Sequence, residues 1–122
     1  MRVIAGEAKG IPLKVPRRVT RPSTDRLREA LFSILGERVV DAVVLDLFAG
    51  SGALGVEALS RGAARCTFVE ENAAGCGVIR SNLEKTGLQG GTVVARDVFK
   101  ALEGRRESYD LILADPRETD LV

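Results

Sequence analysis

Four acidic residues end or follow short apolar runs in this sequence, and the first of them precedes a glycine-rich turn. They are Asp46, Glu70, Asp97 and Asp115. A carboxylate accepts hydrogen bonds from hydroxyl, ammonium and amino groups, so these acids suit a ligand that carries such donors. In an open α/β sheet, ligands bind outside the carboxyl ends of the strands. The pattern therefore predicts one ligand site that is lined by four carboxylates.

The glycine-rich turn contains Gly50, Gly52 and Gly55, which also have the spacing of a dinucleotide-binding fingerprint. The apolar segment Val43–Leu47 before it is predicted to be a buried strand, and the apolar residues over 53–59 are predicted to form a helix. Glycine is favoured in such a turn because a side chain would block the close approach of the backbone to a ligand. The turn predicts a site for a nucleotide-like cofactor.

Asp46, four residues before Gly50, separates two classes of cofactor. A carboxylate at this point would repel the pyrophosphate of a dinucleotide, whereas it would attract the cationic amino-acid end of S-adenosylmethionine. Glu70 suits hydrogen bonds to ribose hydroxyls in both classes and does not discriminate between them. The alternative for Asp46 and Glu70 is that both acids only cap helices at the strand ends.

Alternating strands and helices must position these residues. Strands are predicted over 43–47, 65–69, 92–95 and 109–114, and helices over 27–35, 53–61, 72–86 and 98–102. This alternation predicts an α/β fold with a parallel sheet and right-handed crossovers. A hairpin is expected over 2–16. We expect residues 1–36 to form a basic hairpin-and-helix segment and 37–122 to form the cofactor-binding domain.

The charge distribution points to a polyanionic partner. The chain of 122 residues has a net charge of +1, but residues 1–40 hold nine basic and four acidic residues. A basic segment on a mildly acidic body suits a nucleic acid, although it could also be a solvated basic surface. Histidine is absent and the two cysteines, Cys66 and Cys76, have no metal-ligand spacing, so no metal and no disulfide are expected. Without a long apolar stretch or a signal segment, a cytoplasmic protein with no membrane contact is predicted.

The motifs resemble those of a known enzyme class. The segment Asp46–Gly52 resembles the cofactor motif of class I S-adenosylmethionine-dependent methyltransferases, and Leu113–Pro116 resembles the start of the Asp-Pro-Pro-Tyr motif of enzymes that methylate exocyclic amino groups of bases. The segments 1–6 and 20–32 are similar to the opening of the bacterial 16S ribosomal RNA guanine-N2 methyltransferases of the RsmD type. The likeness runs from Met1 to Pro116.

This resemblance implies a role for each candidate residue. The implied S-adenosylmethionine site consists of Asp46, Phe48, Gly50, Ser51, Gly52, Glu70, Asp97 and Val98. The turn would line the methionine end of the cofactor, Glu70 would hold the ribose, and Asp97 with the Val98 amide would contact the adenine. Asp97 is also a candidate helix N-cap, and the two roles are compatible.

The resemblance also implies a catalytic pair and an RNA contact. The Asp115 carboxylate and the Pro116 carbonyl would receive the target amino group. The implied partner is ribosomal RNA or the small ribosomal subunit, bound by a monomer. From the charge of the N-terminal segment, in which only Glu7 opposes them, the basic residues expected to contact the RNA phosphates are Arg2, Lys9, Lys14, Arg17, Arg18 and Arg21.

The sequence departs from the family pattern after Pro116. The family has a second proline and an aromatic residue there, whereas this chain has Arg117 and Glu118 and ends at Val122. We therefore expect a Rossmann-like sheet with only its first four strands, incomplete at the C-terminus, and poor methyl transfer. Three alternatives stay open, namely an adenine or cytosine amino-methyltransferase, a non-catalytic remnant that binds cofactor or RNA, and a nicotinamide-dependent oxidoreductase.

Overall fold

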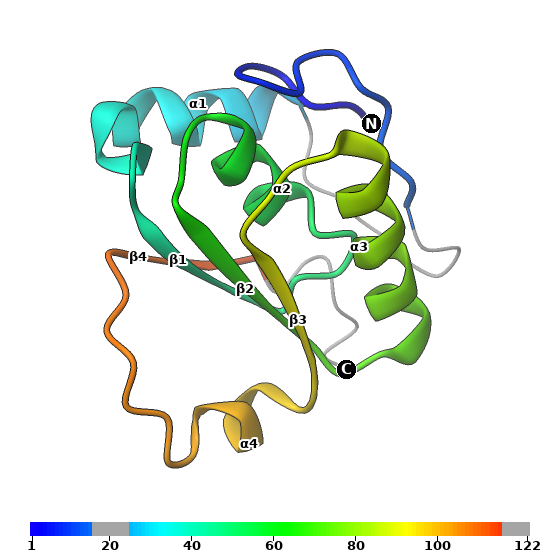
Figure 1. Cartoon of the computed structure of the whole chain (residues 1–122), viewed down its shortest axis with the longest axis vertical. Helices are drawn as coiled ribbons and strands as arrows, with labels where there is room; N and C mark the ends of the chain where they lie inside the picture. The colour runs from blue at the N-terminus through cyan, green and yellow to red at the C-terminus, as the bar shows by residue number, and fades with distance from the viewer. Residues whose placement is uncertain (16–24, 116–122) are drawn as a thin grey trace.

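A computed structural model describes residues 1–15 and 25–115 of the chain (Figure 1). The elements in chain order are α1 (Asp25–Leu35), the 3-10 helix η1 (Gly36–Val39), β1 (Val43–Leu47), α2 (Ala53–Ser60), β2 (Arg65–Glu70), α3 (Ala73–Thr86), β3 (Gly91–Ala95), α4 (Val98–Leu102) and β4 (Leu111–Ala114). The alternation of strands and helices confirms the predicted α/β fold. Arg17, Arg18, Arg21 and Pro116 lie outside the described residues.

The four strands form one parallel sheet in the order β3-β2-β1-β4. From β1 the chain first adds β2 and β3 on one side, and then returns to place β4 on the other side of β1. Because all strands run in the same direction, their carboxyl ends form one rim of the sheet, here called the carboxyl rim. In open α/β sheets the ligand crevice lies at this rim, where the strand order reverses. That point is between β1 and β4.

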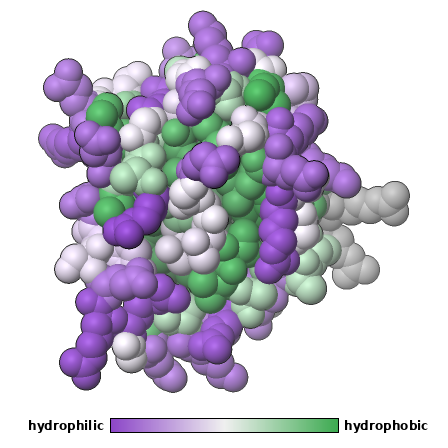
Figure 2. Space-filling view, in the orientation of Figure 1, coloured by the Kyte–Doolittle hydropathy of each residue, from purple (hydrophilic) through white to green (hydrophobic). Residues whose placement is uncertain are grey.

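Helices cover the two faces of the sheet unequally (Figure 1). The larger hydrophobic cluster joins one face of the sheet to α1, α2 and α3 through residues such as Phe32, Val56 and Ile79. On the opposite face a smaller cluster contains Val98 and Ala101 of α4. Figure 2 shows hydrophobic side chains in a band over the region of the sheet, between hydrophilic side chains.

The helix that follows the glycine turn lies unusually close to the sheet. A Cβ added at Gly55 would overlap the ring of Phe68 and lie 2.7 Å from the Sγ of Cys66. Glycine at this position therefore permits α2 to pack against β2, which is the role expected of the third glycine in such a turn. This close packing fixes where the start of α2 meets the carboxyl rim.

The predicted N-terminal hairpin is present only as an isolated antiparallel bridge between Arg2 and Pro12. Hydrogen bonds join the two limbs, with the Val3 amide 3.0 Å from the Ile11 carbonyl oxygen. Longer strands do not form because Pro12 has no N–H, and because the amides of Ile4 and Ala5 bond to a side chain of α2 instead. The segment is nevertheless part of the core.

Helix α1 turns one side toward the core. On the other side, Ile34 is 76% exposed and Leu27 is 43% exposed. Phe32 and Arg28 are buried, and Leu31 and Leu35 pack against the core. The Arg28 guanidinium donates to the Arg2 carbonyl and to Asp25, each at 2.7 Å, which holds this side of the helix inward.

Candidate functional site

The turn between β1 and α2 lies at the carboxyl rim. Gly50 and Gly52 have φ values of 59° and 79°, in the left-handed region that glycine occupies without strain. Phe48 has a φ of 56° although it has a Cβ, which is uncommon and costs free energy. Strained residues of this kind cluster at ligand sites. The turn is closed by a bond of 2.7 Å from the Gly52 amide to the Ala49 carbonyl.

Asp46 lies beneath this turn and is 1% exposed. One of its carboxylate oxygens accepts a hydrogen bond from the Gly55 amide at 3.0 Å, so the side chain satisfies a free N–H in the first turn of α2. The helix-capping alternative for Asp46 is therefore observed. A capping bond uses only part of a carboxylate's accepting capacity, and it orients the negative charge toward the turn.

Glu70 ends β2 and joins the turn to the start of α3. Its two carboxylate oxygens accept from the amides of Gly50 and Asn72, both at 2.8 Å, and the residue is 3% exposed. Gly75 packs against it, because a Cβ at that position would lie 3.1 Å from Glu70 Cγ and 3.3 Å from the Gly50 carbonyl oxygen. Asn72 caps α3 by accepting from the Gly75 amide.

Asp97 and Val98 lie at the end of β3. The Asp97 side chain accepts from the Lys100 amide at 3.1 Å and is the N-cap of α4, so this expected structural role is observed. Val98 is buried in the smaller hydrophobic cluster with Leu45 and Val69. Both residues follow β3 and lie at the carboxyl rim, next to the end of β2 that carries Glu70.

Asp115 directly follows β4 and is partly exposed. The register pairs Leu47 of β1 with Ala114 of β4, so the next residues along the two chains are Phe48 and Asp115. This arrangement brings Asp115 beside the glycine turn at the point where the strand order reverses. The four predicted acids thus share one rim, in the order Asp97, Glu70, Asp46 and Asp115.

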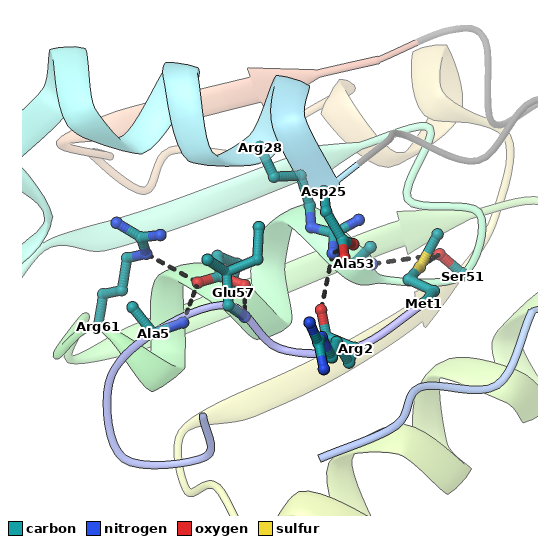
Figure 3. Close-up of polar contacts among 10 residues, drawn as sticks. Met1, Arg2, Ala5, Asp25, Arg28, Ser51, Ala53, Glu57 and Arg61 are labelled. Carbon is teal, nitrogen blue, oxygen red and sulfur yellow. Dashed lines mark hydrogen bonds and ion pairs between the residues drawn. The ribbon is translucent and has the colours of Figure 1, made fainter. Parts of the chain in front are cut away.

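The N-terminal segment, residues 1–15, is bound to the helix that follows the turn (Figure 3). The Glu57 carboxylate is fully buried and accepts from the amides of Ile4 and Ala5 at 2.9 and 3.1 Å. Arg61 donates to the same carboxylate at 2.8 Å. Of the six predicted RNA contacts, the structure describes Arg2, Lys9 and Lys14, and all three have exposed side chains.

Three buried polar residues near the site were not predicted from the sequence, namely Arg28, Glu57 and Asn82. Glu57 is the only charged residue in the apolar run of α2, and Asn82 lies one helical turn after the buried Ile79 of α3. Both residues are polar and lie on the apolar side of a helix, and this pattern could have identified Glu57 and Asn82 from the sequence. Arg28 gave no such signal, because arginine is common on the exposed side of a helix.

The thiols of Cys66 and Cys76 are both buried. Burial raises the pKa of the Cys66 thiol well above its usual value, and the nearby Asp46 charge adds to this effect. Burial also raises the pKa of Cys76, with a further contribution from Glu70 that Arg80 opposes. Both cysteines are free, as predicted. None of the helices in the described ranges has the length and apolar character needed to span a bilayer.

Comparison with known proteins identifies the family. The model of a family described as "Conserved hypothetical protein 95" matches residues 1–117. The chain belongs to this family. The ribosomal RNA small subunit methyltransferase D of Escherichia coli is 40% identical over 117 residues, which cover 95% of this chain and 59% of that protein. YlbH of Bacillus subtilis is 41% identical over 121 residues, covering 95% and 66%.

Solved structures show the same fold. The yhhF protein of Escherichia coli superposes with a TM-score of 0.87 at 40% identity, over 95% of this chain and 63% of that one. The SMU.776 structure, complexed with SAH (S-adenosylhomocysteine), gives a TM-score of 0.57 at 25% identity, over 66% of this chain and 23% of that one. The sheet is thus that of a Rossmann-like class I methyltransferase. The chain spans about 60% of the length of the Escherichia coli relatives that it matches.

Proposed function

We propose that this chain binds S-adenosylmethionine at the carboxyl rim and carries the cofactor half of an enzyme that methylates the N2 amino group of a guanine in small-subunit ribosomal RNA. The observation that supports this most strongly is the glycine turn, with the buried Asp46 beneath it and Asp115 beside it at the point of strand reversal. The ribosomal RNA methyltransferase relative supports the substrate class.

The residues at the rim fit the proposed cofactor. A glycine turn allows close approach of the methionine end, and the carboxylates provide acceptors for ammonium and hydroxyl groups. Glu70 would hold the ribose through its carboxylate oxygens, each of which can accept more than one hydrogen bond. Asp97, with the Val98 amide, would bind the adenine. When bound, S-adenosylmethionine would supply an electrophilic methyl group on a positively charged sulfur.

Asp115 would make the target amine reactive. The lone pair of a guanine N2 atom is delocalised into the ring, so this nitrogen is a poor nucleophile. Hydrogen bonds from its two N–H groups to the Asp115 carboxylate and the Pro116 carbonyl would localise the lone pair and orient it toward the methyl group. Catalysis would therefore rest on positioning and electrostatics. The target base must be unstacked to reach this point of the rim.

Methyl transfer to small ribosomal subunits that lack the modification tests the proposal. Because the chain spans about 60% of its Escherichia coli relative, the assay compares the chain alone with a chimera in which the C-terminal part of that relative follows Asp115. We expect tritiated methyl groups in N2-methylguanosine with the chimera, little transfer by the chain alone, and none by the chimera with Asp115→Ala. Label in an adenine or cytosine nucleoside would instead favour another amino-methyltransferase.

A further inference from the structure

Asn82 of α3 joins the cofactor turn to the N-terminal segment. The residue is fully buried. Its Oδ1 accepts from the Lys14 amide at 2.7 Å, and its Nδ2 donates to the carbonyl oxygens of Lys14 and Ser51, each at 3.0 Å. One amide side chain thus bonds to both backbone groups of Lys14 and, at the same time, to the carbonyl between the two turn glycines.

These bonds make Asn82 difficult to replace. The amide group offers two N–H donors and one acceptor oxygen, and the three bonds use both donors and the oxygen. An apolar side chain at this position would leave buried backbone groups without their partner, which is costly. A carboxylate would keep the bond to the Lys14 amide but would turn an oxygen toward two carbonyl oxygens.

A second contact joins Ser51 to the N-terminal segment. Its hydroxyl donates to the Sδ of Met1 at 3.8 Å and accepts from the Ala53 amide at 3.3 Å (Figure 3). The segment also bonds to α2, which begins directly after the turn, through Glu57 and through the Ser60 hydroxyl. A displacement of the turn is therefore transmitted to residues 1–15, and a displacement of these residues reaches the turn.

We propose that Asn82 is a positioning residue that couples the two binding events, so that cofactor at the glycine turn strengthens RNA binding by the N-terminal segment. Cofactor bound at the glycine turn would hold this turn and with it the Ser51 carbonyl to which Asn82 donates, and Asn82 holds the Lys14 backbone. The exposed Lys14 side chain is then presented to the RNA phosphates at a defined place. The coupling is reciprocal, because RNA must raise cofactor affinity by the same factor. This inference rests on the proposed function.

The test measures RNA affinity with and without SAH, using unmodified 16S ribosomal RNA and the full chain. We expect saturating SAH to tighten RNA binding by about fivefold or more in the unaltered protein, within the usual range of coupling between sites. Asn82→Asp and Asn82→Ala should each reduce this factor to about one. Val39→Ala, which removes buried apolar volume from η1, controls for general destabilisation and should retain the full factor.

The outcomes separate the coupling from the proposed function. If SAH and RNA each bind the unaltered protein but do not affect one another, the coupling is refuted and the proposed function stands. If Asn82→Asp retains the coupling, the connection does not pass through Asn82. If neither Asn82 variant folds, the measurement on the unaltered protein still decides whether the sites are coupled. Failure of SAH to bind the unaltered protein would refute the proposed function together with this inference.

Discussion

At the scale of residues, three of the four carboxylates at the candidate site also stabilise the fold. Asp46 caps α2, Glu70 joins the glycine turn to α3, and Asp97 caps α4. Because these bonds use backbone amides at the starts of helices, they hold the acids in place before any ligand arrives. The position of the Glu70 carboxylate depends on how closely the neighbouring backbone packs against it. Substitutions at two glycines of α3 test this dependence.

Gly75 and Gly77 of α3 form a matched pair. A Cβ at Gly77 meets no atom within 4 Å, so Gly77→Ala should raise the free energy of unfolding by about 1 kcal/mol and leave SAH affinity unchanged. A Cβ at Gly75 would press on Glu70 and the turn. Gly75→Ala should therefore weaken SAH binding by about tenfold, or about 1.4 kcal/mol. Equal SAH affinities of the two variants by calorimetry would contradict this account.

The two buried thiols predict a dependence of stability on pH. Their pKa values are raised in the folded chain by burial, with contributions from the Asp46 and Glu70 charges. Unfolded thiols titrate near pH 8.5, so above about that pH the unfolded chain loses protons that the folded chain keeps. Stability should therefore fall as the pH rises from about 7.5 to about 9.5, by up to roughly 1.4 kcal/mol for each thiol.

Urea denaturation at the two pH values measures this fall. The double variant Cys66→Ala, Cys76→Ala lacks both thiols and should show a shallower dependence on pH. The comparison is kept below about pH 10, because burial also raises the pKa of Tyr109, whose titration would add at higher pH. The same pH dependence in both proteins would show that the thiols are not the groups responsible.

At the scale of elements, the sequence predicted the strands and helices well because their signals are local. The apolar run at Val43–Leu47 was sufficient to locate β1, and the helix predicted over 72–86 agrees with α3 to within one residue. The side-chain bonds that hold the N-terminal hairpin and α1 in place could not be predicted, because their partners are distant in the sequence. Glu57 takes the amides that a second strand would have used, and Arg2 holds Arg28 inward.

The N-terminal segment gives a prediction about salt. If Arg2, Lys9 and Lys14 contact phosphates, the logarithm of RNA affinity should fall steeply with the logarithm of salt concentration. Replacing the three by alanine should reduce this slope by up to about two units, since each single-strand contact contributes about 0.7. A control with Arg38, Lys85 and Arg106 replaced removes the same charge from exposed positions elsewhere.

Filter-binding titrations over a range of salt concentrations would measure both slopes. The dependence of RNA affinity on salt should change little in the control variant, because charges act weakly on one another beyond the screening length. If both variants lose the same amount, the segment acts only as part of the overall charge and the RNA contact lies elsewhere.

At the scale of the whole molecule, the parallel order β3-β2-β1-β4 brings acids that are distant in sequence to one rim. This convergence was predictable, because each acid ends or follows a strand and all four strands were expected to be parallel. The bonds that join the rim to the N-terminal segment were not, because they involve single buried side chains such as Asn82 whose partners lie 68 and 31 residues away. The fold thus joins the proposed cofactor site and the basic N-terminal segment in one unit.

The measurement that tests the central claim most directly is calorimetric titration of the purified chain with SAH and, separately, with NAD. The account predicts saturable binding of SAH and no detectable binding of NAD, because the carboxylate beneath the turn favours a cationic amino-acid end and repels a pyrophosphate. Glu70→Ala should weaken SAH binding by about 1–3 kcal/mol, whereas Glu71→Ala, at the exposed neighbouring position, should not. Tighter binding of NAD than of SAH would contradict the account.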